Sequence, residues 1–191
     1  MVRAIIFDCF GVLTTDGWLP LKEKYFGRDK KLFKEAGEMN RQVNTGLITQ
    51  QDRVSWVAKE TNMSENEVQQ KINHNVPNEE LFTYIEVLKL NYKIGLLSNV
   101  GGDYLKEIFT KEHIALFDAV ALSYETGIIK PDPRAYESIT AKLGAELEEC
   151  VFIDDQERYS SAAQEIGMQA IVYKDFGQMK LELEQILRGA S

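Results

Sequence analysis

Residues 5–13 read Ile-Ile-Phe-Asp-Cys-Phe-Gly-Val-Leu, and this stretch decides the fold of the chain. It begins as a run of apolar side chains and changes at Asp8 into a loop that contains glycine. A continuously apolar run, as opposed to an alternating one, is typical of a strand that is covered on both faces in a parallel sheet. The stretch therefore predicts a buried strand near the N-terminus with an acidic side chain at its carboxyl end.

Four further segments have the same apolar, β-favouring character as the first strand, which we place at 2–7. They are residues 94–97, 119–122, 151–153 and 170–173. Helical patterns lie between or after them, at 103–112, 133–143, 157–166 and 177–187. One helix is well delimited, since Asp132 can cap it, Pro133 suits its first position and Gly144 can end it. This alternation predicts an α/β fold with a doubly wound, Rossmann-like parallel sheet of five strands.

One interval breaks the alternation of strands and helices. About 85 residues separate the first two strands, whereas a βαβ unit needs about 30. The interval contains helical patterns at 30–43, 50–60, 64–74 and 79–90, and its mixed-charge run 22–34 is expected to face solvent. We therefore predict an α/β core of residues 1–14 and 92–191 and a small helical cap of residues 15–91, whose last helix, 79–90, is expected to join the core. An insertion after the first strand emerges over the ligand-binding edge of such a sheet, where it can act as a lid.

Polar side chains follow the predicted strands, where they are expected to meet at one edge of the sheet. They are Asp8, Ser98, Asn99, Lys130, Asp154 and Asp155. Three carboxylates at one point repel each other, and a divalent cation relieves that repulsion. Oxygen-only ligands of this kind suit Mg²⁺, which binds one or two carboxylates together with substrate phosphate and water. Ser98 and nearby amides can then hold phosphate oxygens, Lys130 adds positive charge, and Asp8 can attack phosphorus.

The order of these segments resembles the haloacid dehalogenase superfamily over the whole chain. The four motifs stand here as Phe7-Asp8-Cys9-Phe10-Gly11-Val12, Leu96-Leu97-Ser98-Asn99, Lys130-Pro131-Asp132-Pro133 and Phe152-Ile153-Asp154-Asp155. The resemblance implies that Asp8 is both nucleophile and metal ligand and that the carbonyl of Phe10 is a second ligand. It further implies that Asp155 binds Mg²⁺ directly, that Asp154 acts partly through water, and that Ser98, Asn99 and Lys130 bind the substrate. The helical insertion resembles the C1-type cap of the phosphatase and dehalogenase branch.

Phe10 is the main departure from that family pattern. Phosphatases of the family carry a second Asp there, which protonates the leaving oxygen and then activates water, and general acid–base catalysis contributes about 10²–10⁴-fold. Asp16 is the nearest possible substitute, although a loop or helix-capping role is favoured for it. Substrates with good leaving groups depend less on the acid. An aromatic residue here, together with Tyr136, also fits the metal-free L-2-haloacid dehalogenases, whereas Asp154 and Asp155 favour Mg²⁺.

Three functions therefore follow from the sequence. The first is a Mg²⁺-dependent hydrolase that acts on a small phosphorylated molecule through an aspartyl-phosphate at Asp8, with weakened leaving-group catalysis. The second is a non-catalytic or regulatory protein that binds a phosphorylated ligand or a partner, and the third is a metal-free 2-haloacid dehalogenase. His74 and His113 lie outside every motif and are assigned no catalysis, and Trp18 and Trp56 are expected to pack the cap.

The composition of the 191-residue chain excludes several other classes. It has 22 Lys and Arg against 30 Asp and Glu, a net charge of −8, which argues against nucleic acid as a partner. Two cysteines do not make a disulfide framework, so a reducing, cytoplasmic setting is expected. No run of about 18 apolar residues is present, so no membrane-spanning helix is expected, and Asp8 interrupts the apolar N-terminus too early for a signal peptide. Nothing in the sequence indicates an oligomeric state.

Overall fold

The computed structural model describes residues 1–189 and has a parallel five-stranded sheet at its centre, in the order β3-β2-β1-β4-β5. The strands are β1 (Ala4–Phe7), β2 (Lys93–Ser98), β3 (Ala119–Leu122), β4 (Cys150–Asp154) and β5 (Gln169–Val172). In the central strand, Phe7 pairs with Leu96 on one side and with Ile153 on the other. All of β1 is buried, as its unbroken apolar sequence predicts. The doubly wound α/β fold is thus confirmed.

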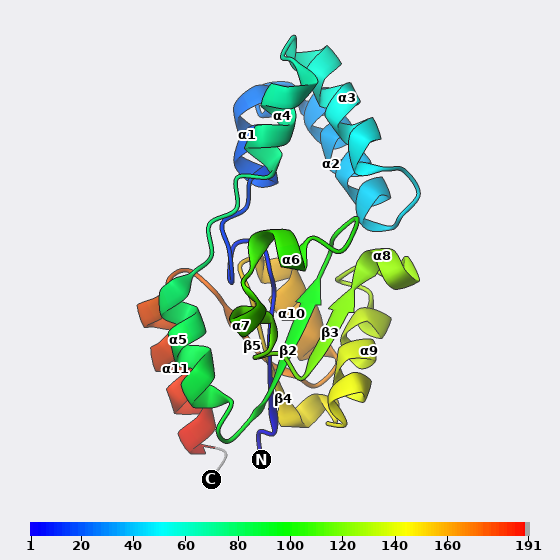
Figure 1. The fold of residues 1–191 in the computed structure, drawn as a ribbon. Coiled ribbons are helices and arrows are strands. Elements are labelled where there is room, and N and C mark those ends of the chain that lie inside the picture. The colour runs from blue at the N-terminus through cyan, green and yellow to red at the C-terminus, as the bar shows by residue number, and fades with distance from the viewer. Residues whose placement is uncertain (190–191) are drawn as a thin grey trace.

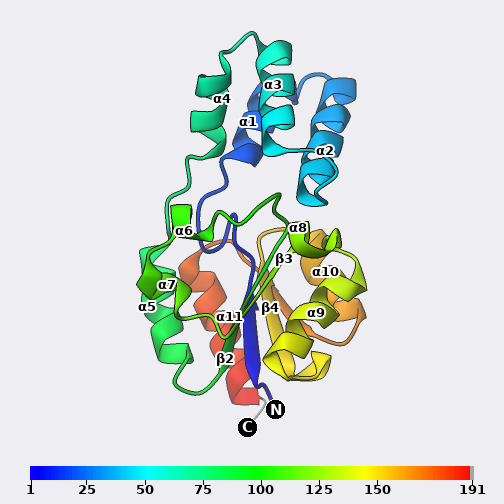
Figure 2. The same cartoon turned by 45° about the vertical axis from the view of Figure 1, so that its right-hand side comes forward.

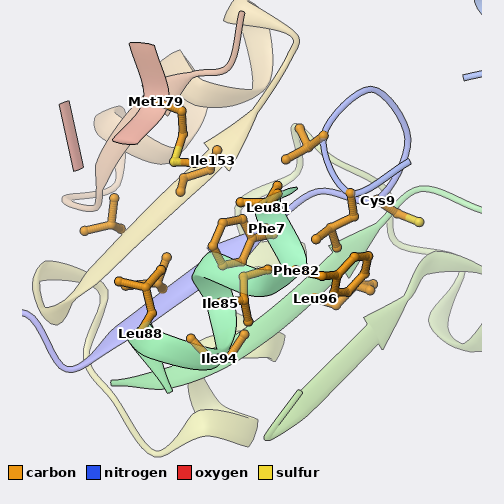
Figure 3. Packing of buried hydrophobic residues seen from close by; sticks show 14 of the residues in the cluster. Phe7, Cys9, Leu81, Phe82, Ile85, Leu88, Ile94, Leu96, Ile153 and Met179 are labelled. Carbon is orange, nitrogen blue, oxygen red and sulfur yellow. The ribbon is translucent and has the colours of Figure 1, made fainter. Parts of the chain in front are cut away.

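Helices cover both faces of the sheet (Figure 1). On one face lie α5 (Glu79–Leu88) and α11 (Phe176–Gly189), and on the other lie α9 (Pro133–Leu143) and α10 (Glu157–Glu165). Successive side chains of a strand point to opposite faces, so Phe7 joins the first layer and Ile6 the second. Figure 3 shows the first layer, in which Ile85 and Met179 belong to one cluster with Phe7. The two buried layers fix the sheet that carries the polar edge.

Four helices form a separate group beyond the carboxyl ends of the strands (Figures 1 and 2). They are α1 (Trp18–Phe26), α2 (Lys30–Asn44), α3 (Gln50–Thr61) and α4 (Glu65–Ile72). This group has its own apolar cluster, which includes Trp18, Phe26 and Val57, and the Trp56 ring lies 5.2 Å from that of Phe26. The helix group therefore packs around itself and not against the sheet.

Two chain segments connect the helix group to the sheet, and they run side by side. The Thr15 amide donates to the Val76 carbonyl at 3.1 Å, and the Val76 amide donates to Thr15 Oγ1 at 2.9 Å. Next to this pair, the amide of Asn78 donates to the carbonyl of Leu13 at 2.9 Å. These bonds tie the exit and the return of the insertion into one narrow connection.

The structure differs from the sequence predictions at two helices. The predicted helix 103–112 is two short helices, α6 (Leu105–Ile108) and α7 (Lys111–Ile114), because Phe109 is extended and Thr110 caps the second one. Helix α1 was not predicted, and the charged run 22–34, predicted to be a solvated face, begins within it, with Glu23, Lys24 and Lys34 exposed. Two short elements were also not predicted, namely α8 (Ser123–Thr126) and the 3₁₀ helix η1 (Leu147–Glu149). Within residues 1–189, no helix has both the length and the apolar character that crossing a membrane requires.

The helix group touches the sheet domain at the end of α2. Ser123 Oγ donates to the Asn44 carbonyl at 2.6 Å and accepts from the Val100 amide at 2.9 Å. Gly101 lies directly against Val43, since a Cβ built on Gly101 would clash with Val43 Cγ1 and come within 2.9 Å of the Val43 carbonyl oxygen. The contact therefore depends on the absence of a side chain at position 101.

We predict that Gly101→Ala loosens this contact. Overpacking of this kind costs about 1–3 kcal/mol, so the Val100 amide should exchange with solvent about tenfold faster or more. Gly37→Ala, a substitution within α2, is the control. The nearest atom to the added Cβ there is Lys22 Nζ at 3.5 Å, so the new methyl group meets no backbone. Hydrogen exchange followed by mass spectrometry or NMR makes the measurement, and equal Val100 protection in both variants would contradict the prediction.

Candidate active site

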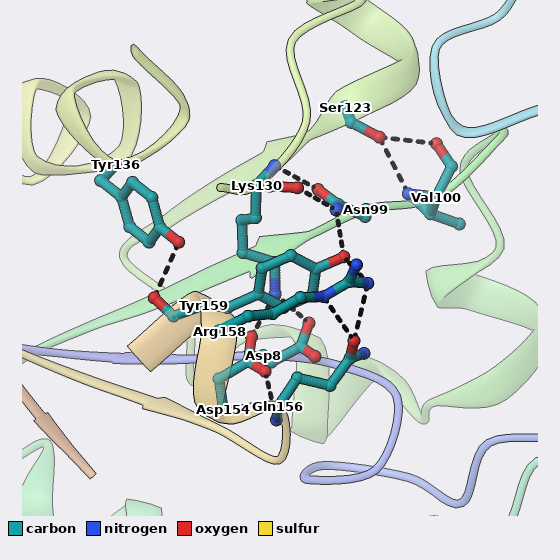
Figure 4. Close-up of polar contacts among 10 residues, drawn as sticks. All are labelled: Asp8, Asn99, Val100, Ser123, Lys130, Tyr136, Asp154, Gln156, Arg158 and Tyr159. Atoms are coloured by element: carbon teal, nitrogen blue, oxygen red, sulfur yellow. Dashed lines mark hydrogen bonds and ion pairs between the residues drawn. The ribbon is translucent and has the colours of Figure 1, made fainter. Parts of the chain in front are cut away.

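A buried ion cluster lies at the carboxyl edge of the sheet (Figure 4). Lys130 Nζ is 2.8 Å from Asp8 Oδ1 and 2.6 Å from Asp154 Oδ2. Asp8 follows β1, Asp154 ends the neighbouring strand β4, and Lys130 comes from the segment between α8 and α9. All three residues are at most 5% exposed. The sequence prediction that these residues meet at one edge of the sheet therefore agrees with the structure.

Asn99 holds the backbone of Lys130 with both ends of its side-chain amide. Its Oδ1 accepts from the Lys130 amide at 2.8 Å, and its Nδ2 donates to the Lys130 carbonyl at 3.0 Å. Asn99 was predicted to bind substrate, and in the structure its amide is engaged in positioning the lysine. Sequence reasoning missed this role because a side-chain-to-backbone pairing across 31 residues leaves no local pattern.

Two aromatic rings border the ammonium group of Lys130. Its Nζ lies 5.0 Å from the ring centre of Tyr159 and 5.3 Å from that of Phe152. The Tyr136 hydroxyl donates to the Tyr159 carbonyl at 2.9 Å, which fixes the segment that carries the first ring. Such rings exclude water from the charged cluster while their faces attract the cation.

The cluster carries more negative than positive charge. Asp8, Asp154 and Asp155 can each offer an oxygen, and these oxygens lie within 4.8 Å of one another. With Lys130 as the ammonium that pairs with them, three ionised carboxylates leave a formal charge of −2. A buried charge of this size is unfavourable without a further partner.

The pKa values of the cluster follow from burial and from this charge. Burial raises the pKa of Asp8, with Lys130 opposing and Asp154 adding to the rise. Burial and then Asp154 raise the pKa of Asp155 to about 6. Burial alone would lower the pKa of Lys130, but Asp154 and Asp8 outweigh it and keep that pKa above its ordinary value. The lysine is therefore charged, and the carboxylates need additional positive charge to ionise together.

The donor set fits a divalent cation. All the ligands that the cluster offers are oxygens, which suits Mg²⁺. Asp155 Oδ1 is buried and lacks a hydrogen-bond partner among the described residues, so it is free to bind an ion. Gly11 has a φ of +87°, and a Cβ there would lie 2.5 Å from Asp155 Oδ2. The loop after β1 can therefore approach the Asp155 carboxylate this closely because residue 11 is glycine and has no Cβ.

Ser98 and Phe10 also lie where the sequence places them, Ser98 at the end of β2 and Phe10 in the loop that follows β1. Ser98 is 1% exposed, and its Oγ has no hydrogen-bond partner within the described part of the chain. A buried hydroxyl without a partner is unusual and can be satisfied by a ligand oxygen. The Phe10 ring packs partly against the apolar layer and lines the cavity above the sheet, so it offers no acid there.

A cavity of about 700 Å³ lies between the sheet edge and the helix group. Asp8, Phe10 and Lys130 line it from the sheet, and Trp18 and Asp16 line it from the insertion. Asp16 Oδ1 accepts from the Trp18 amide at 2.7 Å and Oδ2 from the Leu19 amide at 3.3 Å, which is the helix-capping role favoured for it. Its pKa is raised by burial and lowered in part by these two bonds. The cavity is large enough for a small metabolite.

The chain is similar to known hydrolases. A family model for haloacid dehalogenase-like hydrolases matches residues 2–167. A protein from Mycobacterium tuberculosis named as a phosphatase is 38% identical over 34% of this chain and 30% of its own length. The bifunctional epoxide hydrolase 2 of Sus scrofa is 26% identical over 97% of this chain and 39% of its own length. The matches thus span well under half of these two relatives.

Solved structures share the fold. An enzyme of the same family from Bacteroides thetaiotaomicron, crystallised as a complex with magnesium and inorganic phosphate, superposes with a TM-score of 0.71 at 22% identity. The superposition covers 94% of this chain and 99% of that one. Together with the family match over most of the sequence, the fold and the acidic edge show that this chain belongs to the haloacid dehalogenase-like hydrolases.

We predict that Lys130→Met strongly destabilises the protein in metal-free buffer. Removing one partner of a buried ion cluster leaves uncompensated charge and costs about 3–5 kcal/mol. Lys142→Met is the matched control, because Lys142 is exposed and makes a hydrogen bond to the Val120 carbonyl at 2.7 Å and a surface ion pair with Glu125 at 3.7 Å. Urea denaturation measures both free energies of unfolding. Losses of similar size in the two variants would contradict the assigned role of Lys130.

Proposed function

We propose that the protein is a Mg²⁺-dependent phosphatase that acts on a small phosphorylated molecule through a covalent aspartyl-phosphate at Asp8. The observation that carries this proposal is the pairing of Asp8 with Lys130 at a cavity, in a cluster whose three carboxylates, when all are ionised, leave a formal charge of −2. The magnesium and phosphate in the Bacteroides relative and the phosphatase name of the mycobacterial relative support it.

The residues that would hold Mg²⁺ are Asp8, Asp154, Asp155 and the carbonyl of Phe10. When bound, Mg²⁺ supplies positive charge that lowers the repulsion between the carboxylates and the phosphoryl oxygens. Lys130 adds a further positive charge next to Asp8 and Asp154. The rings of Tyr159 and Phe152 shield its ammonium group from solvent. Ser98 can donate its otherwise unpartnered hydroxyl to a phosphoryl oxygen.

The proposed reaction has two displacement steps at phosphorus. In the first, a carboxylate oxygen of Asp8 forms a bond to phosphorus, and the bond to the leaving oxygen breaks with its electron pair going to the leaving group. In the second, water attacks the phosphorus, the bond to Asp8 breaks, and inorganic phosphate and a proton are released. Such transfers depend mostly on positioning and electrostatic stabilisation, which the buried cluster supplies.

Phe10 slows both steps, and it makes the first one dependent on the leaving group of the substrate. Its ring can neither protonate a leaving alkoxide in the first step nor take a proton from water in the second. Leaving groups that are stable as anions, such as nitrophenolate or the carboxylate of an acyl phosphate, need no proton. We therefore expect these substrates to phosphorylate Asp8 readily and the second, hydrolytic step to be slow.

We predict that Asp8→Asn lowers Mg²⁺-dependent hydrolysis of p-nitrophenyl phosphate by about three orders of magnitude or more, because an amide cannot act as the nucleophile. Asp29→Asn is the control, since Asp29 is an exposed cap of α2 and Asn caps helices equally well. Nitrophenolate release is followed by absorbance. Equal rates for Asp8→Asn and the natural sequence would exclude this route.

We predict that Phe10→Asp raises turnover of alkyl phosphates by about 10²-fold or more, because it restores the general acid and base. Phe10→Leu, which removes the ring without adding an acid, should leave these substrates slow. The same Asp variant should abolish an initial burst of nitrophenolate that we expect from the natural sequence. Two results together would contradict the role assigned to position 10. The natural sequence would show no burst of nitrophenolate, and Phe10→Asp would turn over alkyl phosphates no faster.

The two alternative functions have different signatures in the same assays. A non-catalytic member would be stabilised thermally by phosphate and Mg²⁺ without turning over any phosphate ester. A 2-haloacid dehalogenase would release halide from 2-haloacids in the absence of metal. Either result, in place of Asp8-dependent phosphate release, would overturn the proposed function.

A further inference from the structure

Three cationic side chains line the cavity without a carboxylate partner. They are Lys22 on α1, Arg53 on α3 and Arg158 on α10. Within residues 1–189, none of the three forms an ion pair with Asp or Glu, whereas Arg41, which lines the same cavity, is paired with Glu38. In a chain of net charge −8, these three side chains place positive charge on the walls of this cavity.

Arg53 gives the strongest indication of an anion site among the three because it is buried. It is 6% exposed, and its guanidinium donates to two neutral oxygens of the helix group, Asn40 Oδ1 and Gln50 Oε1. Its Nε is buried and has no hydrogen-bond partner in the described chain. The guanidinium lies 4.6 Å from the centre of the Trp18 ring, and Asp16, the carboxylate that attracts it electrostatically, caps α1. A buried guanidinium with a free donor and neutral neighbours is suited to receive an anion.

Lys22 and Arg158 line the cavity from its two sides, the helix group and the sheet domain. Lys22 belongs to the helix group and rests 3.7 Å above the Phe33 ring centre. Arg158 belongs to the sheet domain, where it stacks 4.4 Å from the Tyr159 ring and donates to Gln156 Oε1 and to the Tyr159 hydroxyl (Figure 4). The two are close enough for Arg158 to lower the pKa of Lys22, in addition to burial and against the attraction of Glu23. An anion between them would remove this repulsion and hold the two domains together.

These cations differ from the groups assigned to the transferred phosphoryl group. Lys130 is already paired with Asp8 and Asp154 in the sheet edge, whereas Arg53 and Lys22 are fixed to the helix group by partners of that group. The cavity therefore offers one site for the reacting phosphoryl group at the sheet edge and a separate group of cations, with Lys22 and Arg53 on the helix group and Arg158 on α10.

We propose that the substrate carries a second anionic group, a carboxylate or a second phosphate, which Arg53, Lys22 and Arg158 bind. The inference rests on the proposed function in that the first phosphoryl group occupies the Asp8 end of the cavity. The ligand class is thus a small molecule with two anionic ends, and the helix group selects it through charge on the far end.

The test compares non-hydrolysable ligands that differ only at their far end. Alkylphosphonates with two to six carbons, ending in a methyl group, a carboxylate or a second phosphonate, are titrated by calorimetry into the protein with Mg²⁺. At the best chain length, the anionic end should raise affinity about tenfold or more, since charge-assisted hydrogen bonds are stronger than neutral ones. The carboxylate and phosphonate series show which of the two anions the site takes.

Variants assign that gain to the three cations. Lys22→Met, Arg53→Gln and Arg158→Gln should each reduce the advantage of the anionic end while leaving the methyl-ended ligands unchanged. Lys31→Met is the matched control, because Lys31 lies in the same helix group, is exposed and contacts Glu35. Arg158 is exposed and Lys22 half-buried, so these two variants keep the test valid if Arg53→Gln does not fold.

Two results would overturn the inference. One is the absence of any preference for an anionic end at every chain length. The other is a preference that persists in Lys22→Met and Arg158→Gln. The two proposals can fail separately. Tighter binding of ligands with an anionic end, without Asp8-dependent turnover, would support the second anion site and contradict the proposed function. Asp8-dependent turnover without tighter binding of these ligands would contradict only the second anion site.

Discussion

The pairing of Lys130 with Asp8 and Asp154 is the interaction on which the rest of the site depends. It joins the ends of two adjacent strands to a segment from the other side of β2, and it does so where all three side chains are buried. Buried charges are tolerated only when they are paired, so this cluster constrains the edge of the sheet to one arrangement. Since one lysine does not balance three carboxylates, the same arrangement creates a demand for a cation and, through it, for an anionic ligand.

The helix group provides the second wall of the cavity in which a cation and an anionic ligand can bind. It has its own apolar cluster, is connected by two adjacent segments and touches the sheet domain at Val43 and Gly101. It lies beyond the strand ends, and the cavity between it and the sheet edge is lined by Asp8 and Lys130. It also brings its own positive charge, Lys22 and Arg53, into an acidic protein. Reaction chemistry and ligand selection are thus divided between the sheet edge and the insertion.

Much of this architecture could be predicted from the sequence, for physical reasons that also explain the failures. The strands are unbroken apolar runs, and acids or hydroxyls follow them directly, so Asp8, Ser98 and Asp154 could be placed at one edge. Helix α1 was not predicted because Leu19, Pro20 and the charged run Lys22–Lys24 interrupt the spacing of its three buried positions, Trp18, Leu21 and Phe26. The hydrogen bonds between the Asn99 side chain and the Lys130 backbone could not be predicted, and neither could the burial of Arg53. Both depend on residues that only tertiary packing brings together.

The most direct test of the account is whether Asp8 carries the phosphoryl group. The protein is mixed with p-nitrophenyl phosphate and Mg²⁺, quenched in acid within the first turnover and digested for mass spectrometry. Because Phe10 cannot activate water, the aspartyl-phosphate should accumulate, and the peptide that contains Asp8 should be phosphorylated. Nitrophenolate release without any phosphorylation of Asp8 would contradict the central claim.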